Sequence, residues 1–252
     1  MTRKILLSLF GILCLAPLSA QTPLRIAAAA DLEPVLPPIL DQFRQATGIR
    51  AEATFQASAM LATQIQNGAP FDLVLSADLG YPRRLIEAGL ADSPAPALYA
   101  RGTLVLWARK DSHLPPPSLD LLRNPDLRRL AIANPDRAPY GRAAVAALTS
   151  LNLYDQLKPR LVTAENIAQA AQFVDSGNAD AGLISLTSAL TPRLAASGAY
   201  AVIPDGLYPE IQQGAVVLGK SSPRDAAHKL LDYLLSPPIQ AQLAKAGLRP
   251  VH

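Results

Sequence analysis

Cysteine and histidine are scarce in this sequence, and their scarcity excludes several kinds of chemistry. Cys14 is the only cysteine among the 252 residues, and it lies in an apolar segment near the N-terminus. The chain beyond residue 20 can therefore form no disulfide, no thiolate metal site and no thiol nucleophile. The three histidines, His113, His228 and His252, have no second metal-binding residue at a useful spacing. We expect no metal ion bound directly by side chains.

The sequence also lacks a large excess of positive or negative charge. The chain has 23 Lys and Arg against 20 Asp and Glu, and its longest basic clusters are the pairs Arg83–Arg84 and Arg128–Arg129. A nucleic-acid-binding protein usually carries a basic stripe, so we expect no nucleic-acid partner. The sequence also lacks the G-x-S-x-G corner of a serine hydrolase and a glycine-rich nucleotide loop after a strand. We therefore expect no enzymatic activity.

The first twenty residues have the organisation of a secretory leader. Two basic residues precede the apolar run Ile5–Ala16, and Leu18–Ala20 offers a small residue for cleavage. The apolar run is about 12 residues long, whereas a membrane-spanning helix needs about 20. Lipid attachment at Cys14 is disfavoured because the preceding residue, Leu13, is not small. The sequence predicts a signal peptide over residues 1–20 and a periplasmic product.

Beyond the leader, apolar strands alternate with amphipathic helices, which predicts α/β architecture with mostly parallel sheets flanked by helices. Half of the residues are hydrophobic, enough for a sizeable core. The expected strands cover residues 24–29, 51–55, 71–75, 103–108, 130–133, 160–162, 181–184, 201–203 and 214–218. The expected helices cover residues 32–46, 58–67, 81–88, 140–151, 167–175, 223–235 and 238–246.

Two polar crossings, around residues 111–118 and 204–206, divide this alternation into two lobes. We expect residues 21–109 and 206–252 to form the first lobe and residues 110–205 the second, with hinges near residues 110–113 and 204–206. Open α/β sheets bind ligands at the carboxyl ends of their strands. Two such lobes predict a ligand cleft between them.

Four strand-to-helix corners carry small or polar residues where a helix begins. They lie at residues 29–32, 56–59, 134–141 and 163–167. Free N–H groups and the helix dipole let such corners bind an anion without lysine or arginine. Taken singly, Asp31, Ser58 and Asn166 are better explained as N-caps than as ligand residues. Trp107 lies in the most apolar strand, where we expect a core position.

At these corners the sequence resembles the periplasmic molybdate-binding proteins of ABC transporters, a family of type II solute-binding proteins. The resemblance covers nearly all of the chain beyond the leader. The stretch from Gly68 to Asp78 is the most specific part, and the corner Pro139–Gly141 matches one branch of the family. The residues that carry it are 26–32, 55–59, 64–78, 134–135, 138–141 and 179–182.

The resemblance implies a two-lobed periplasmic-binding-protein fold that captures a tetrahedral oxyanion, molybdate and also tungstate, and delivers it to an inner-membrane ABC permease. It implies a monomer without a cofactor, in which the metal is bound as the oxyanion. The implied ligand groups are the first-corner residues, the Ser58 hydroxyl, the Tyr140 hydroxyl and the Ile167 amide. Ser185 is a weaker candidate. The full set is Ala30, Asp31, Ser58, Tyr140, Ile167 and Ser185.

Asp31 departs from the serine or asparagine more usual in the family, because an ionised carboxylate cannot donate to an oxyanion and repels it. Three arrangements are open. Asp31 turns away to cap its own helix, is protonated and donates, or accepts a proton from an anion such as hydrogen phosphate. Phosphate and sulfate therefore remain alternative ligands, and an enzyme or ligand sensor on the same fold remains an alternative function.

Overall fold

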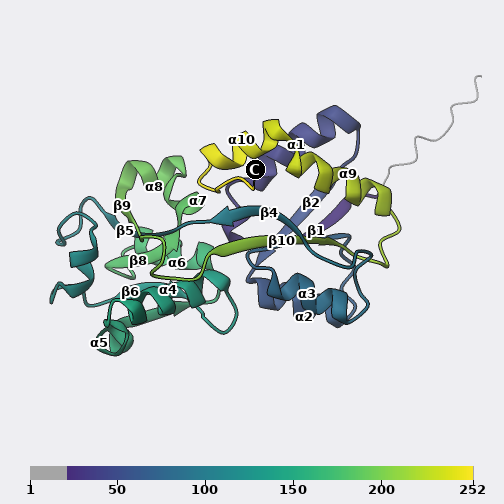
Figure 1. The fold of residues 1–252 in the computed structure, drawn as a ribbon. Helices are drawn as coiled ribbons and strands as arrows, with labels where there is room; N and C mark the ends of the chain where they lie inside the picture. Colours follow the sequence, from purple (N-terminus) through teal and green to yellow (C-terminus); the bar gives the residue numbers. More distant parts are fainter. Residues whose placement is uncertain (1–21, 252) are drawn as a thin grey trace, which may run out of the picture.

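The computed structural model describes residues 22–251, so the expected signal peptide lies outside the described residues. These residues form two lobes, each built on a five-stranded sheet flanked by helices (Figure 1). The strand order is β2-β1-β3-β10-β4 in the first sheet and β7-β6-β8-β5-β9 in the second. The strands are β1 (Leu24–Ala29), β2 (Ala51–Gln56), β3 (Leu73–Ser76), β4 (Ala97–Gly102), β5 (Leu104–Arg109), β6 (Leu130–Ala133), β7 (Leu161–Ala164), β8 (Ala181–Ser185), β9 (Gly198–Val202) and β10 (Ile211–Val217).

Each sheet is mostly parallel, as the alternation of strands and helices predicts. In the first sheet, β10 runs antiparallel to both β3 and β4, and in the second β5 runs antiparallel to both β8 and β9. The expected fold class is confirmed. The α-helices are α1 (Leu36–Thr47), α2 (Ser58–Gln66), α3 (Gly80–Glu87), α4 (Pro139–Ser150), α5 (Tyr154–Leu157), α6 (Ile167–Asp175), α7 (Leu186–Ala189), α8 (Pro192–Ser197), α9 (Arg224–Leu235) and α10 (Pro237–Lys245), and the 3₁₀ turns are η1 (Ala30–Leu32), η2 (Leu119–Arg123) and η3 (Lys158–Arg160).

Helix α1 illustrates how the sequence sets these elements. Its buried residues, Leu36, Ile39, Leu40 and Phe43, recur every three or four positions and cover the first sheet. Gly48 ends the helix at a φ of 74°, a left-handed conformation that glycine adopts without a steric penalty, and its N–H donates to Arg44. At the other end of the chain, α9 and α10 return to the same lobe (Figure 1).

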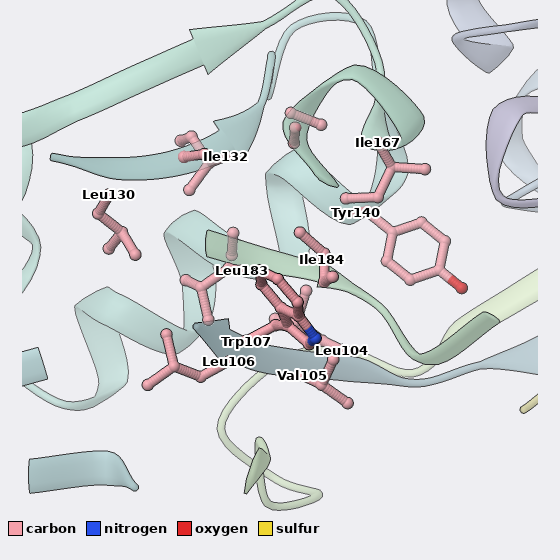
Figure 2. Packing of buried hydrophobic residues seen from close by; sticks show 14 of the residues in the cluster. Leu104, Val105, Leu106, Trp107, Leu130, Ile132, Tyr140, Ile167, Leu183 and Ile184 are labelled. Carbon is pink, nitrogen blue, oxygen red and sulfur yellow. The ribbon is translucent and has the colours of Figure 1, made fainter. Parts of the chain in front are cut away.

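The second lobe contains the largest buried cluster, centred on β5. Trp107 is fully buried there, as expected for a core residue, and aliphatic side chains of β6 and β8 pack around it (Figure 2). Strand β5 lies between two neighbours inside the sheet, which explains why its sequence is apolar up to Arg109 at its end.

The expected boundary between the lobes is wrong. The sequence analysis placed strand 103–108 in the first lobe, but β5 pairs with β8 and β9 in the second sheet. The chain therefore crosses near Thr103, directly after β4, a strand that the sequence analysis missed. The proline-rich stretch 111–118, interpreted as a crossing and a hinge, follows β5 within the second lobe. The return crossing joins β9 to β10 and includes residues 204–206.

Within residues 22–251, the structure contains no helix with the length and apolar character needed to cross a membrane.

Candidate anion-binding site

The four strand-to-helix corners meet at one small cavity between the lobes. The cavity has a volume of about 10 Å³, close to the least room that one water molecule needs. No lysine or arginine is among its lining residues. Five of the six predicted ligand residues line it, and Ser185 does not. The lining residues are Ala29, Ala30, Asp31, Gln56, Ala57, Ser58, Ala77, Ala138, Pro139, Tyr140, Asn166 and Ile167.

Three α-helices begin at this cavity. Helix α2 begins at Ser58 in the first lobe, and α4 and α6 begin at Pro139 and Ile167 in the second. The first N–H groups of an α-helix have no partner within the helix and carry partial positive charge. Since proline has no N–H, the first donor of α4 is the amide of Tyr140. Helix N-termini from both lobes therefore lie at the cavity.

Ser58 is not an N-cap. The cap position of α2 is Ala57, and Ser58 is the first residue of the helix. The Ser58 side chain is buried, and its Oγ accepts a hydrogen bond from the Ala77 N–H at 3.1 Å. Because that bond uses an oxygen lone pair, the hydroxyl hydrogen remains available for a ligand.

Asp31 does not cap its helix either, which corrects one of the three arrangements considered from the sequence. It lies within the turn η1, fully buried, and its Oδ2 accepts hydrogen bonds from the Tyr140 hydroxyl at 3.2 Å and from Nε2 of Gln213. The amide oxygen of Gln213 in turn accepts from the Tyr99 hydroxyl at 2.7 Å. Asp31 Oδ1 is buried without a protein partner among the described residues.

Gln213 and Tyr99 are not among the site residues predicted from the sequence. Gln213 is a fully buried polar residue in β10, where the register shifts between residues 213 and 214. Such an irregularity redirects a side chain relative to the regular pleat. A glutamine at the start of an apolar strand is a local signal that could have marked Gln213. Its partner could not be read from local sequence, because Asp31 is 182 residues away. Tyr99 lies in β4, the strand that was not expected.

The electrostatics of the site centre on Asp31. Burial raises the pKa of Asp31 from 3.8 to about 6, although hydrogen bonds from Gln213, from Tyr140 and from the Asp31 backbone act in the opposite direction. Burial also raises the pKa of Tyr140 and of Tyr99 well above the ordinary value, and the negative charge of Asp31 adds to this effect. Both tyrosines are therefore hydrogen-bond donors at neutral pH.

The Tyr140 hydroxyl, predicted to contact the ligand, is directed at Asp31 instead. A phenol has one hydrogen, and here it is shared with the carboxylate. Figure 2 shows Tyr140 beside Ile167 at the margin of the buried cluster, with its hydroxyl pointing away from the labelled aliphatic residues. The backbone N–H of Tyr140, at the start of α4, is consequently the donor that this residue offers to the cavity.

The remaining candidates serve local structure. Ser185 is the N-cap of α7, and its Oγ accepts from the Ser188 N–H at 3.3 Å. Asn166 caps α6, as the alternative reading of that corner proposed, by accepting from the Gln169 N–H at 2.9 Å. No cluster of three or more histidine, cysteine or acidic side chains suited to a metal ion occurs in the stretch from 22 to 251.

The two lobes are closed over the cavity. Arg142 of α4 forms an ion pair with Asp78 of the first lobe and donates to the Tyr81 hydroxyl at 3.2 Å. The Ala59 N–H of α2 donates across the same interface to the carbonyl of Arg137 at 3.1 Å. The guanidinium of Arg137 itself pairs with Glu165 and does not line the cavity.

Comparison with known proteins identifies relatives of the whole described region. A family model described as bacterial extracellular solute-binding protein matches residues 24–249. The molybdate-binding protein ModA of Azotobacter vinelandii is 37% identical over 227 residues, which are 90% of this chain and 89% of that protein. ModA of Rhodobacter capsulatus is 35% identical, over 81% of this chain and 79% of its own length.

The solved structure of the Azotobacter vinelandii periplasmic molybdate-binding protein superimposes with a TM-score of 0.86 at 30% identity. The match covers 91% of this chain and 100% of that one. The likeness therefore extends over both lobes and the cavity between them.

Proposed function

Because this chain belongs to the bacterial extracellular solute-binding protein family, we propose that it captures molybdate between its lobes and delivers the anion to an ABC permease. The observation that carries the proposal is the set of three helix N-termini, from both lobes, that frame a cavity lined by neither lysine nor arginine. A tetrahedral oxyanion accepts hydrogen bonds in every direction and matches such convergent donors. The molybdate-binding relatives at 35% and 37% identity support this choice of anion.

Ala30, Asp31, Ser58, Tyr140 and Ile167 are the proposed ligand residues. The Ser58 hydroxyl and the N–H groups that begin α2, α4 and α6 supply neutral donors. About five to seven hydrogen bonds to a charged oxyanion, at about 1.5–3 kcal/mol each, exceed the roughly 8 kcal/mol of micromolar binding. The excess offsets desolvation of the anion and ordering of the lobes, so no cation is required.

The cavity has to widen to admit the anion. Its volume of about 10 Å³ is close to the room that a single water needs, and molybdate is larger. Parting and closing of the lobes about the two crossing segments supplies the space, a hinge motion typical of binding proteins. A ligand that contacts α2 in one lobe and α4 and α6 in the other then stabilises the closed state.

Tungstate is expected to bind like molybdate, because the two ions have almost the same size and shape. Sulfate is smaller, so donors set for molybdate contact it less well. Phosphate carries at least one proton at neutral pH, as a mixture of hydrogen phosphate and dihydrogen phosphate, and that proton needs an acceptor. An ionised Asp31 would be one, so phosphate is the alternative ligand that the structure keeps open.

We propose that the protein acts in the periplasm as a monomer, after removal of the leader, and without a cofactor or a catalytic step. The family description as extracellular and the relatives' description as binding proteins support this location and role. Its partner is then a membrane permease that receives the anion.

The test is calorimetric titration of the purified protein with molybdate, tungstate, sulfate and phosphate. We expect one molybdate per chain with a dissociation constant of about micromolar or tighter, similar tungstate binding, and weaker sulfate and phosphate binding. The Ser58→Ala variant should lose about tenfold or more in molybdate affinity, because a donor to a charged group is removed. The exposed Ser150→Ala, at the far end of α4, is the control. Phosphate bound more tightly than molybdate would contradict the proposal.

A further inference from the structure

The two oxygens of the Asp31 carboxyl group have different surroundings. The two side-chain donors, the Tyr140 hydroxyl and Nε2 of Gln213, contact Oδ2. Oδ1 is buried and has no partner among the described residues. Asp31 lines the cavity beside Ala30 and Ser58, so the unpartnered oxygen belongs to a residue of the cavity lining. A buried polar atom left without a partner normally has a functional or solvent explanation.

On the premise of the proposed function, we infer that Asp31 binds a proton on Oδ1 when the anion binds and donates it as a hydrogen bond to an anion oxygen. The proton comes from solvent: one carboxylate, one proton and one oxyanion dianion become one carboxylic acid hydrogen-bonded to the dianion. No covalent bond to the anion forms or breaks. Oδ2 keeps its two protein donors, and Oδ1 changes from an unpartnered acceptor into a donor.

Among the groups around Asp31, its own carboxyl group is the one whose protonation state changes when the anion binds. Its turn packs against β2, α6 and α7, and its carboxyl group contacts α4 and β10 through Tyr140 and Gln213. Helix α7 has no titratable residue and contributes the Thr187 hydroxyl, which donates to the Asp31 carbonyl oxygen at 2.7 Å. At the cavity, α6 contributes Asn166 and Ile167 and β2 contributes Gln56, all uncharged.

The remaining titratable neighbours are tyrosines. Tyr140 contacts Asp31 directly, Tyr99 lies behind Gln213, and Tyr208 acts on Tyr140 from farther away. Each has a pKa raised by burial, so each stays neutral. The cation that α4 carries, Arg142, pairs with Asp78, and no lysine or arginine lines the cavity. A dianion placed against Asp31 therefore adds like-charge repulsion, and the carboxyl responds by taking up a proton. Burial has already raised the pKa of Asp31 to about 6 in the absence of the anion.

Protonation of Asp31 would make the site selective among oxyanions. A protonated Asp31 donates toward the cavity where an ionised Asp31 would accept, so an anion with no proton of its own fits better. Hydrogen phosphate brings an O–H that can no longer donate to Asp31, and an unpaired buried donor lowers affinity. Asp31 would thus favour fully deprotonated oxyanions, and binding would become weaker as the pH rises.

The test is titration of the wild-type protein with sodium molybdate in two buffers of different ionisation enthalpy, at about pH 7.5. The difference in apparent binding enthalpy gives the number of protons taken up. We expect close to one proton per bound molybdate, and an affinity that falls about tenfold for each pH unit between about pH 7 and 9. Asp31→Asn should take up no proton, show a flat pH profile and bind molybdate at about pH 8 at least as tightly as wild type. Glu33→Gln, an exposed neighbour, should behave as wild type.

The outcomes separate the inference from the function on which it rests. Tight molybdate binding without proton uptake would overturn the inference and leave the proposed function intact. Phosphate binding tighter than molybdate binding, lost in Asp31→Asn, would show that Asp31 accepts a proton and overturn both. Absence of molybdate binding at about pH 6, where the inference predicts the tighter end of the range, would reject the proposed function. If Asp31→Asn fails to fold, the two-buffer measurement on wild type alone decides.

Discussion

Replacing Asp31 with asparagine should make the ligand-free protein more stable at neutral pH. The pKa of Asp31 is raised by burial from 3.8 to about 6 in the folded protein. The folded state therefore binds more protons than the unfolded state between about pH 4 and 6, and stability falls as the pH rises through that window. Each tenfold change in proton affinity corresponds to about 1.4 kcal/mol, so the ionised carboxyl lowers the free energy of unfolding by up to about 3 kcal/mol above pH 6.

Asparagine removes this titration while its amide oxygen can still accept from Tyr140 and Gln213. We expect the stability difference, variant minus wild type, to rise by up to about 3 kcal/mol between about pH 4 and 7. For a chain of this size that corresponds to about 6–12 °C in melting temperature. Thermal unfolding across this pH range, without added anion, measures the difference directly. Glu33→Gln, exposed and two residues away, should show no such change. A stability difference for Asp31→Asn that does not vary with pH would refute the reasoning.

Two further predictions concern the contact between the lobes and the support of Tyr140. Arg142→Ala removes a partly exposed ion pair and a hydrogen bond across the interface. Since such pairs contribute about 0–1 kcal/mol, molybdate affinity should fall by up to about fivefold, and small-angle scattering should show a larger radius of gyration. The control variant Arg137→Ala should change neither the affinity nor the radius of gyration. A Cβ added at Gly102 would lie 2.3 Å from the Tyr140 hydroxyl oxygen. Gly102→Ala should therefore lower the free energy of unfolding, measured by urea denaturation, by about 1–3 kcal/mol. Gly80→Ala, where the atom nearest to an added Cβ is 3.8 Å away, should not lower it.

The sequence predicted the elements that have regular apolar patterns. Helix α6 matches its expected range, and β6 does as well. The buried residues of α6 follow helical spacing, and all four residues of β6 are buried, as expected for a strand covered on both faces. Strand β4 was missed because its sequence, ALYARG, is short, mixed in polarity and contains arginine and glycine. Without β4, strand β5 was assigned to the wrong lobe, because local pattern cannot reveal which sheet a strand joins.

The site was predictable where it depends on the backbone and not where it depends on long-range partners. The corners at Ser58 and Ile167 were found because small and polar residues before an amphipathic helix have a local signature. The partners of Asp31 were not found, because Tyr140 and Gln213 lie 109 and 182 residues from it in sequence. For the same reason the Tyr140 hydroxyl was assigned to the ligand, although it donates to Asp31.

The most direct test of the account is the position of the metal in a crystal of the protein grown with molybdate. Anomalous scattering at the molybdenum edge identifies the metal without assumptions about the ligand. The account predicts one molybdenum atom per chain in the cavity between Ser58, the Tyr140 amide and the Ile167 amide, with no lysine or arginine side chain against its oxygens. Molybdenum bound instead at a surface pocket, such as that beside Arg25 and Lys220, would contradict it.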